Sequence, residues 1–287
     1  MFRRKFLVGS SVLLAMPACA ATRMASITSQ YEKATGGHIG VYARNLKTKQ
    51  CLAWRENERF VMCSTFKASL AALTLLRADQ GKENLETFVP YTASDLGDAY
   101  APVAKANVKA GGLSVKAMCQ AAVEWSDNAC ANMLLARVGG PAALTRFWRS
   151  LGEHETRLDD WEPVLNRTPP GGLRNTTTPA AMAAILQHLV LGHVLSAESC
   201  SLLTGWIKDC HTGSKRLRAG FPSTWVVGDK TGNNGRDAVG DIAVAWSRQG
   251  TPLIVCVYTR GGQPDETQLF EAFSGIARIA VETLCRV

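Results

Sequence analysis

The stretch at residues 225–258 reads WVVGDKTGNNGRDAVGDIAVAWSRQGTPLIVCVY and contains three apolar runs, at residues 225–227, 242–246 and 253–258. Short runs of Val, Ile and aromatic residues bounded by Gly, Asn and Asp predict β-strands. The links between the runs are too short for a helical crossover, so consecutive strands are predicted to pair antiparallel. The last third of the chain therefore predicts a largely antiparallel sheet.

The beginning of the chain adds two further strands. Apolar runs at residues 39–43 and 51–54 flank a polar turn, which predicts a hairpin. Between the two strand regions, Ala and Leu recur at helical spacing. The predicted helices lie at residues 66–80, 115–125, 128–138, 141–151 and 179–191, with a final helix at 266–285.

Strands at both ends of the chain and helices between them indicate a discontinuous fold. We expect an α/β domain formed by residues 21–63 and 208–287, in which helices flank the sheet, and an inserted all-α lobe at residues 64–207. A cleft between two such lobes is a natural place for an active site.

Composition excludes several classes of protein. The 287 residues are 46% hydrophobic and 20% charged, and the formal charge of +8 is scattered rather than gathered into a basic stripe. We therefore expect no nucleic-acid partner. The nine cysteines form no C-x-x-C pair and the five histidines lack zinc-site spacing, so neither a metal nor another cofactor is expected.

The N-terminus has the pattern of an export signal. Basic residues 3–5 precede an apolar stretch at 6–16 and an A-x-A site around Cys19, which together predict a signal peptide at residues 1–20 with a twin-arginine pattern. The mature protein is then expected in the periplasm without a membrane span. Lipid attachment at Cys19 is the alternative.

Two motifs point to nucleophilic chemistry. Residues 64–67 read STFK, so Ser64 stands where a helix begins and Lys67 returns to the same helix face one turn later. Such a Lys can orient or deprotonate the hydroxyl. At residues 126–128, SDN offers the Ser126 hydroxyl as a proton donor to a leaving nitrogen and the Asn128 amide as a substrate contact.

Two later motifs complete the set. Lys230, Thr231 and Gly232 end the first late strand, where Lys and Thr can bind a carboxylate and Gly lets a ligand lie against the backbone. In the loop WEPVLN at residues 161–166, Glu162 and Asn166 can hold one water as base and orienter. Each motif alone also fits an ordinary cap, strand end or surface loop, but the order of all four indicates one site.

These four motifs, and the segments around them from about residue 30 onward, resemble the class A serine β-lactamases. The resemblance implies the β-lactamase/transpeptidase-like fold and hydrolysis of penicillins and cephalosporins by a monomer that confers antibiotic resistance. It implies catalytic roles for Ser64, Lys67, Ser126 and Glu162. It leaves open whether Lys67 or Glu162 is the base for acylation.

The resemblance also implies the substrate contacts. The backbone N–H groups of Ser64 and Asn233 would hold the oxyanion, and Tyr100 would flank the cleft. Arg216 is the candidate that assists the carboxylate-binding motif, whereas Arg218 is expected to be structural. The remaining expected contacts are Asn128, Asn166, Lys230, Thr231 and Gly232.

The chain departs from the family pattern at several positions. Many members close the loop that bears the Glu with an Arg–Asp ion pair, but Asp160 and Asn175 occupy those positions here, so Arg157, Arg174 or another residue must replace it. Cys119 matches one half of a disulfide that many members have, but the position of its partner holds no Cys. Cys63 matches a Cys that is bridged in carbapenem-hydrolysing members, but Asn234 takes the partner position, so carbapenem hydrolysis is not inferred.

Two rival functions share the first three motifs. A penicillin-binding peptidase or transpeptidase would form the acyl-enzyme but release it slowly, and a non-catalytic β-lactam sensor would keep it. Glu162 with Asn166 argues against the peptidase, because a site for a deacylating water is what a hydrolase requires. The sensor is not expected, because such domains are usually tethered to a membrane receptor and the sequence shows no second transmembrane segment and no linker.

Overall fold

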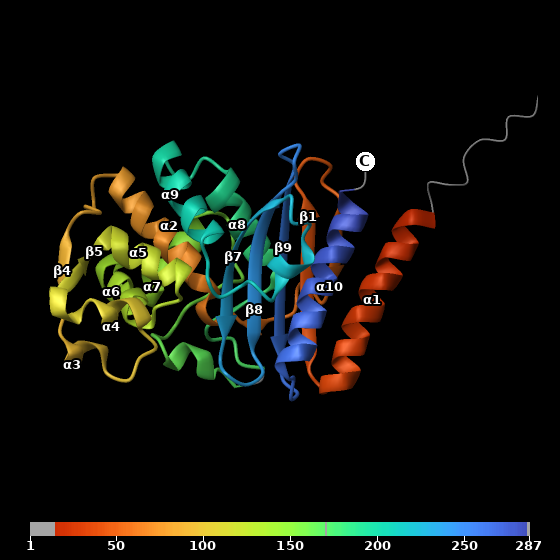
Figure 1. The fold of residues 1–287 in the computed structure, drawn as a ribbon, viewed down its shortest axis with the longest axis horizontal. Coiled ribbons are helices and arrows are strands. Elements are labelled where there is room, and N and C mark those ends of the chain that lie inside the picture. Colours follow the sequence, from red (N-terminus) through yellow and green to blue (C-terminus); the bar gives the residue numbers. More distant parts are fainter. Residues whose placement is uncertain (1–14, 170, 286–287) are drawn as a thin grey trace, which may run out of the picture.

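A five-stranded sheet lies at the centre of the computed structural model, which describes residues 15–169 and 171–285 (Figure 1). Its strand order is β2-β1-β9-β8-β7, and every neighbouring pair is antiparallel. Strand β1 lies beside β9, so the two ends of the chain share one sheet, as predicted. The strands are β1 His38–Asn45, β2 Cys51–Trp54, β7 Val226–Asn233, β8 Val239–Trp246 and β9 Pro252–Arg260.

Both faces of this sheet are buried, and the alternation of side chains along each strand assigns them to two cores. In β8, Ile242 and Val244 pack with the helical part of the molecule. Their neighbours Ala243 and Ala245 face the other core, formed with α1 (Ala15–Thr35) and α10 (Glu266–Leu284). Figure 1 shows α1 and α10 side by side on that face.

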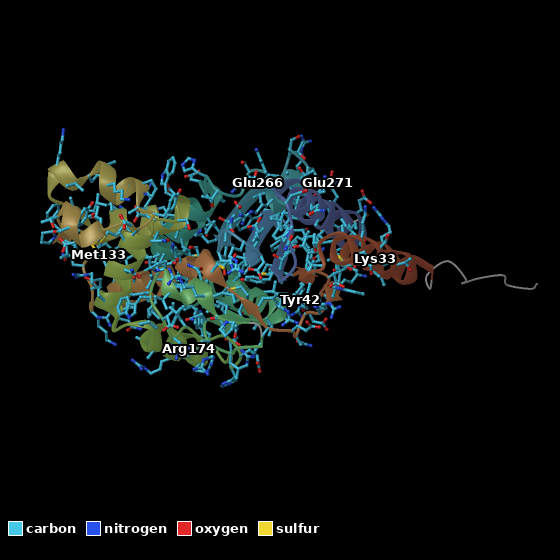
Figure 2. All side chains as sticks on the ribbon, turned by 90° about the horizontal axis from the view of Figure 1, so that it is seen from below. Lys33, Tyr42, Met133, Arg174, Glu266 and Glu271 are labelled. Carbon is cyan, nitrogen blue, oxygen red and sulfur yellow. The ribbon has the colours of Figure 1, made fainter. Side chains whose placement is uncertain are left out.

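The helical part surrounds a buried central helix, α2 (Phe66–Asp79). Figure 2 shows that Met133 of this part and Lys33 of α1 lie toward opposite ends of the molecule. The other helices are α3 Ala93–Leu96, α4 Pro102–Ala106, α5 Val115–Glu124, α6 Asn128–Val138, α7 Pro141–Ser150, α8 Pro179–Leu191 and α9 Ala197–Lys208.

Short elements connect the two parts. The ribbon β3 (Phe60–Val61) with β6 (Thr176–Thr177) is antiparallel, as is β4 (Phe88–Pro90) with β5 (Gly112–Ser114). Four single helical turns are also present among the described residues: one before α2, one after α4, one after α7 and one before β7. These turns are η1 Cys63–Thr65, η2 Val108–Ala110, η3 Val164–Arg167 and η4 Leu217–Gly220.

Helix boundaries follow from local chemistry. The side chains of Ser114, Asp127 and Thr178 each accept a hydrogen bond from the backbone N–H three residues later, which caps α5, α6 and α8. Gly139 ends α6 in the left-handed conformation, where a residue without Cβ is favoured. The helices predicted at residues 66–80, 115–125, 128–138, 141–151, 179–191 and 266–285 all form, whereas α1, α3, α4 and α9 were not predicted.

The predicted signal peptide lies mostly outside the described residues. Only residues 15–20 of it are described, as the first turns of α1. Among the described helices, none is both long and apolar enough to cross a membrane.

We predict that Phe273→Ala costs about 3–5 kcal/mol of unfolding free energy, because the fully buried ring fills the contact between α10 and the sheet. Urea denaturation measures this loss. The matched control is Phe270→Ala on the same helix, where the ring is only partly buried beside Lys215. Equal losses for the two variants would contradict the assigned core.

Candidate active site

Ser64 lies in η1, immediately before α2, as the sequence predicts. Its hydroxyl donates a hydrogen bond to Glu162 Oε1 at 2.9 Å. The preceding residue, Cys63, has a φ of 45°, an uncommon conformation for a residue with a side chain. The start of a helix favours developing negative charge, so Ser64 stands where an anion is stabilised.

Lys67 is fully buried one turn later and contacts the same carboxylate. Its Nζ lies 3.1 Å from Glu162 Oε1 and donates to the Ser126 carbonyl at 2.9 Å and to Asn128 Oδ1 at 2.5 Å. Burial lowers the pKa of Lys67, and the nearby Glu162 charge opposes that shift. The structure thus brings three of the predicted residues together around the ammonium group of a fourth, Lys67.

The SDN motif forms the junction between α5 and α6. Ser126 has a φ of 58°, which turns the chain between the helices. Asp127 is fully buried: one carboxylate oxygen caps α6, and the other accepts hydrogen bonds from the backbone of Val103 and Ala104, at 3.0 Å each. Asp127 therefore fixes the segment that follows Tyr100.

Tyr100 itself is 56% exposed, and its carbonyl accepts a 2.8 Å hydrogen bond from the Asn128 backbone. The backbone of Tyr100 is thus attached directly to the SDN junction. Its exposure leaves the side chain accessible at the edge of the site.

Lys230 and Thr231 lie on β7 and are both buried. Lys230 Nζ donates to Ser126 Oγ at 3.1 Å, which links β7 to the α5–α6 junction. Burial is the main cause that lowers the pKa of Lys230 to about 8. The hydroxyls of Thr231 and Thr212 share a hydrogen bond, so Thr212 belongs to the same cluster.

Gly232 is required by the contact between β7 and η1. A Cβ at this position would lie 2.7 Å from the Met62 carbonyl oxygen and 3.1 Å from the Ser64 nitrogen. The next residue, Asn233, is exposed, and its side chain accepts a hydrogen bond from Gly235 N at 2.7 Å. The end of β7 therefore lies directly against the backbone of Ser64.

The two arginines before β7 have different surroundings. Arg216 Nη1 donates to the carbonyls of Gly232 at 3.0 Å and Gly240 at 2.9 Å, which places its cation beside the end of β7. Burial lowers the pKa of Arg216, and Asp241 is the main group that opposes this. Arg218 instead pairs with the buried Asp229.

Glu162 is held at its backbone and at its carboxylate. Asn132 of α6 donates to the Glu162 carbonyl at 2.9 Å and accepts from the Glu162 N–H at 3.1 Å. Asn166 Nδ2 donates to Glu162 Oε2 at 2.6 Å, while the buried Asn166 Oδ1 has no hydrogen-bond partner among the described residues. An acceptor of this kind next to a carboxylate can orient a water.

Asn132 was not among the predicted site residues. The available signal was its spacing, since it follows Asn128 by four residues on α6 and therefore shares its helix face. Thr212 had no such signal, because only the fold brings it to Thr231.

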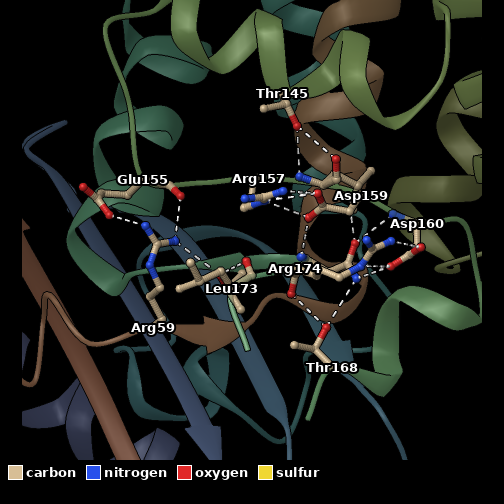
Figure 3. A network of polar contacts seen from close by, with 12 residues as sticks. Arg59, Thr145, Glu155, Arg157, Asp159, Asp160, Thr168, Leu173 and Arg174 are labelled. Carbon is tan, nitrogen blue, oxygen red and sulfur yellow. Dashed lines mark hydrogen bonds and ion pairs between the residues drawn. The ribbon is translucent and has the colours of Figure 1, made fainter. Parts of the chain in front are cut away.

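The Glu162 loop, residues 159–175, is closed at its base by a polar network (Figure 3). Arg174 forms an ion pair with Asp160, and Arg157 forms one with Asp159. The Arg174 hydrogen bond is the main cause that lowers the pKa of Asp160. The substitute for the missing Arg–Asp pair is thus Arg174.

Asn175 is the buried centre of this network. Its Oδ1 accepts hydrogen bonds from the backbone of Asp159 at 2.9 Å and Asp160 at 3.0 Å, and its Nδ2 donates to Asp160 Oδ2 at 2.9 Å. Its φ of 56° suits Asn better than most residues. Arg174, by contrast, projects from the surface (Figure 2).

No metal or disulfide site is found in the part of the chain that the structure describes. No group of three or more His, Cys, Asp or Glu side chains there could hold a metal ion. The cysteines from Cys51 to Cys285 are free thiols, and Cys63 Sγ contacts the Ala238 carbonyl at 3.5 Å.

Comparisons with known proteins agree with this geometry. A family model described as "Beta-lactamase enzyme family" matches residues 21–284. The "Beta-lactamase" of Mycobacterium tuberculosis strain H37Rv is 40% identical over 302 aligned positions, which cover 96% of this chain and 97% of the relative. The "Carbapenem-hydrolyzing beta-lactamase KPC" of Klebsiella oxytoca is 39% identical, with 89% and 87% covered.

A solved structure has the same fold. The "Last common ancestor of Gram-negative bacteria (GNCA4) beta-lactamase class A" superposes with a TM-score of 0.87 at 47% identity, covering 91% of this chain and 99% of that one.

We predict that Asn175→Asp loosens the Glu162 loop and costs about 1–3 kcal/mol, because it removes a buried donor to Asp160 and places a second carboxylate beside it. Hydrogen exchange of residues 159–175 and urea denaturation measure the effect. The control, Arg174→Gln, removes only the exposed partner of Asp160 and should cost less. A larger loss for the control would show that the surface ion pair, not Asn175, maintains the loop.

Proposed function

Because the chain belongs to the class A serine β-lactamases, enzymes that hydrolyse β-lactams and confer antibiotic resistance, we propose the role of each residue in that reaction. We propose penicillins and cephalosporins as substrates and Ser64 as the nucleophile that opens the four-membered ring. The observation that carries the proposal is the contact of Glu162 with both Ser64 and Lys67.

Acylation begins at the Ser64 hydroxyl, which already donates to Glu162 Oε1. We infer that Glu162 accepts this proton as Ser64 attacks the lactam carbonyl, and that Lys67 stabilises the carboxylate from 3.1 Å. A positioned base of this type contributes about 10²–10⁴-fold in rate. The geometry thus favours Glu162 over Lys67 as the base.

The oxyanion would lie between the backbone N–H groups of Ser64 and Asn233. The close approach of Gly232 to the Ser64 nitrogen supports this pairing, since it brings the end of β7 to the start of α2. Loss of one such donor costs about 10²–10³-fold in rate.

Ser126 is proposed to protonate the departing lactam nitrogen. Lys230 donates to Ser126 Oγ, so the hydroxyl oxygen acts as an acceptor there and its own proton is available for the substrate. Lys230, Thr231 and Arg216 then bind the ring carboxylate, and Asn128 contacts the acyl amide.

Before deacylation, the proton that Glu162 took from Ser64 passes through Lys67 to Ser126, which restores the hydroxyl that protonated the lactam nitrogen and leaves Glu162 a carboxylate again. Deacylation then requires a water that Glu162 activates and Asn166 orients. The free Asn166 Oδ1 beside the Glu162 carboxylate supports this site. A peptidase or a sensor needs no such pair, so the hydrolase is favoured over both.

We further propose that the protein is exported to the periplasm through residues 1–20 and acts as a monomer. The lobes formed by residues 21–63 with 208–287 and by 64–207 would then bound the cleft. The basic and apolar segments at the N-terminus support export.

We predict that the wild type turns over nitrocefin continuously. In Glu162→Ala both steps slow, but release slows more than acylation because Lys67 still contacts the site whereas the water loses its base, so an acyl adduct accumulates on Ser64. Stopped-flow absorbance and intact-protein mass spectrometry distinguish the two states. Ser64→Ala is the control that forms no adduct. A single stoichiometric burst from the wild type, or normal turnover by Glu162→Ala, would overturn the proposal.

We predict that kcat/KM for benzylpenicillin falls as the pH rises above about 8, where Lys230 loses its proton and its attraction for the ring carboxylate. Burial has lowered this pKa, so the cation is present below pH 8 and absent above it. The control is Lys230→Arg, whose guanidinium stays charged at every pH tested. An identical alkaline fall in that variant would assign the titration to another group.

A further inference from the structure

A cavity of about 550 Å³ adjoins the active site between the Glu162 loop and the turn from β7 to β8. Asn166 and Arg167 line it on the loop side. The turn contributes Asn233, Asn234 and Arg236 to the opposite wall. Asn166 and Asn233 also belong to the proposed catalytic site, so the cavity shares two residues with it.

The charges that line this cavity are unequal. Arg167 and Arg236 are both exposed, and neither guanidinium has a hydrogen bond or ion pair with another described residue. The lining carboxylate, Asp237, is committed elsewhere: it accepts from Asn234 Nδ2 at 3.0 Å and from Gly261 N at 2.8 Å. Two unpaired cations therefore face the cavity against one carboxylate, whose oxygens are held by neutral donors, so the charged side chains of the lining are net positive.

Both arginines are carried by well-fixed backbone. Asn234 Oδ1 accepts hydrogen bonds from the N–H groups of Arg236, Asp237 and Ala238, which fixes the turn. Arg167 ends η3, which is anchored by the buried Leu165. Such anchoring restricts where the two guanidinium groups can reach.

The proposed binding mode orients a substrate toward this cavity, and the following inference rests on that proposed function. With the ring carboxylate at Lys230 and Thr231, the lactam carbonyl lies near Asn233. That is two residues, or about 6–7 Å, farther along β7. The acyl side chain then continues in the same direction, into the cavity.

We propose that Arg167 and Arg236 make this cavity a subsite for acyl side chains that carry a carboxylate. The preferred substrate class is β-lactams with two carboxylates, one on the ring and one on the side chain. The first binds at Lys230 and Thr231, and the second lies between the loop and the turn. Charge attraction of this kind guides specificity more than affinity.

The test compares carbenicillin with benzylpenicillin, which differ by one side-chain carboxylate. The readout is the ratio of their kcat/KM values. We expect Arg167→Gln and Arg236→Gln each to lower the carbenicillin-to-benzylpenicillin ratio by about two- to fivefold, as for exposed ion pairs, and the double variant to lower it further. Added salt should lower the wild-type ratio as well.

Arg248→Gln is the matched control, since Arg248 is an exposed arginine in the turn between β8 and β9, outside the cavity lining. Its ratio should equal that of the wild type. An unchanged ratio in the double variant, or an equal loss for both substrates, overturns the subsite. Absence of benzylpenicillin turnover in the wild type would instead overturn the proposed function.

Discussion

The buried contact between Lys67 and Glu162 is the interaction on which the site depends. Both side chains are fully buried, and each comes from a different part of the fold, α2 and the Glu162 loop. Removing one partner of such a pair leaves an uncompensated buried charge, which costs about 3–5 kcal/mol. The fold must therefore hold the loop against α2, and the same constraint keeps Glu162 in contact with the Ser64 hydroxyl.

Several contacts serve this constraint without touching a substrate. Asn132 holds the Glu162 backbone from α6, and Asn175 closes the loop at its base. Residues 160 and 175, where many members have an Arg–Asp ion pair, cannot form one here. Arg174 forms an ion pair with residue 160 instead. A loop need not keep the family's ion pair to keep its carboxylate in place, provided that its buried amide groups remain satisfied.

The site also brings together buried cations, whose burial costs free energy. Lys67 and Lys230 are buried, Arg216 lies beside the end of β7, and burial lowers the pKa of all three. A protein accepts this cost where an anion is to be bound, because the same low-dielectric surroundings strengthen the attraction for it. Arg167 and Arg236 extend this positive field to the outer cavity, where we propose that the substrate side chain binds.

The sequence by itself determined the antiparallel sheet, six of the helices and the four motifs, because strand and helix patterns, caps and short links act locally. It also determined that Asp160 and Asn175 could not form an ion pair. Only the tertiary structure decided that Arg174 replaces it, that Asn132 holds Glu162 and that Thr212 meets Thr231. Those partners lie far apart in the chain or depend on side-chain direction, so no local pattern encodes them. The juxtaposition of Arg167 with Arg236 across a cavity is of the same kind, since it arises only when a loop and a sheet turn meet.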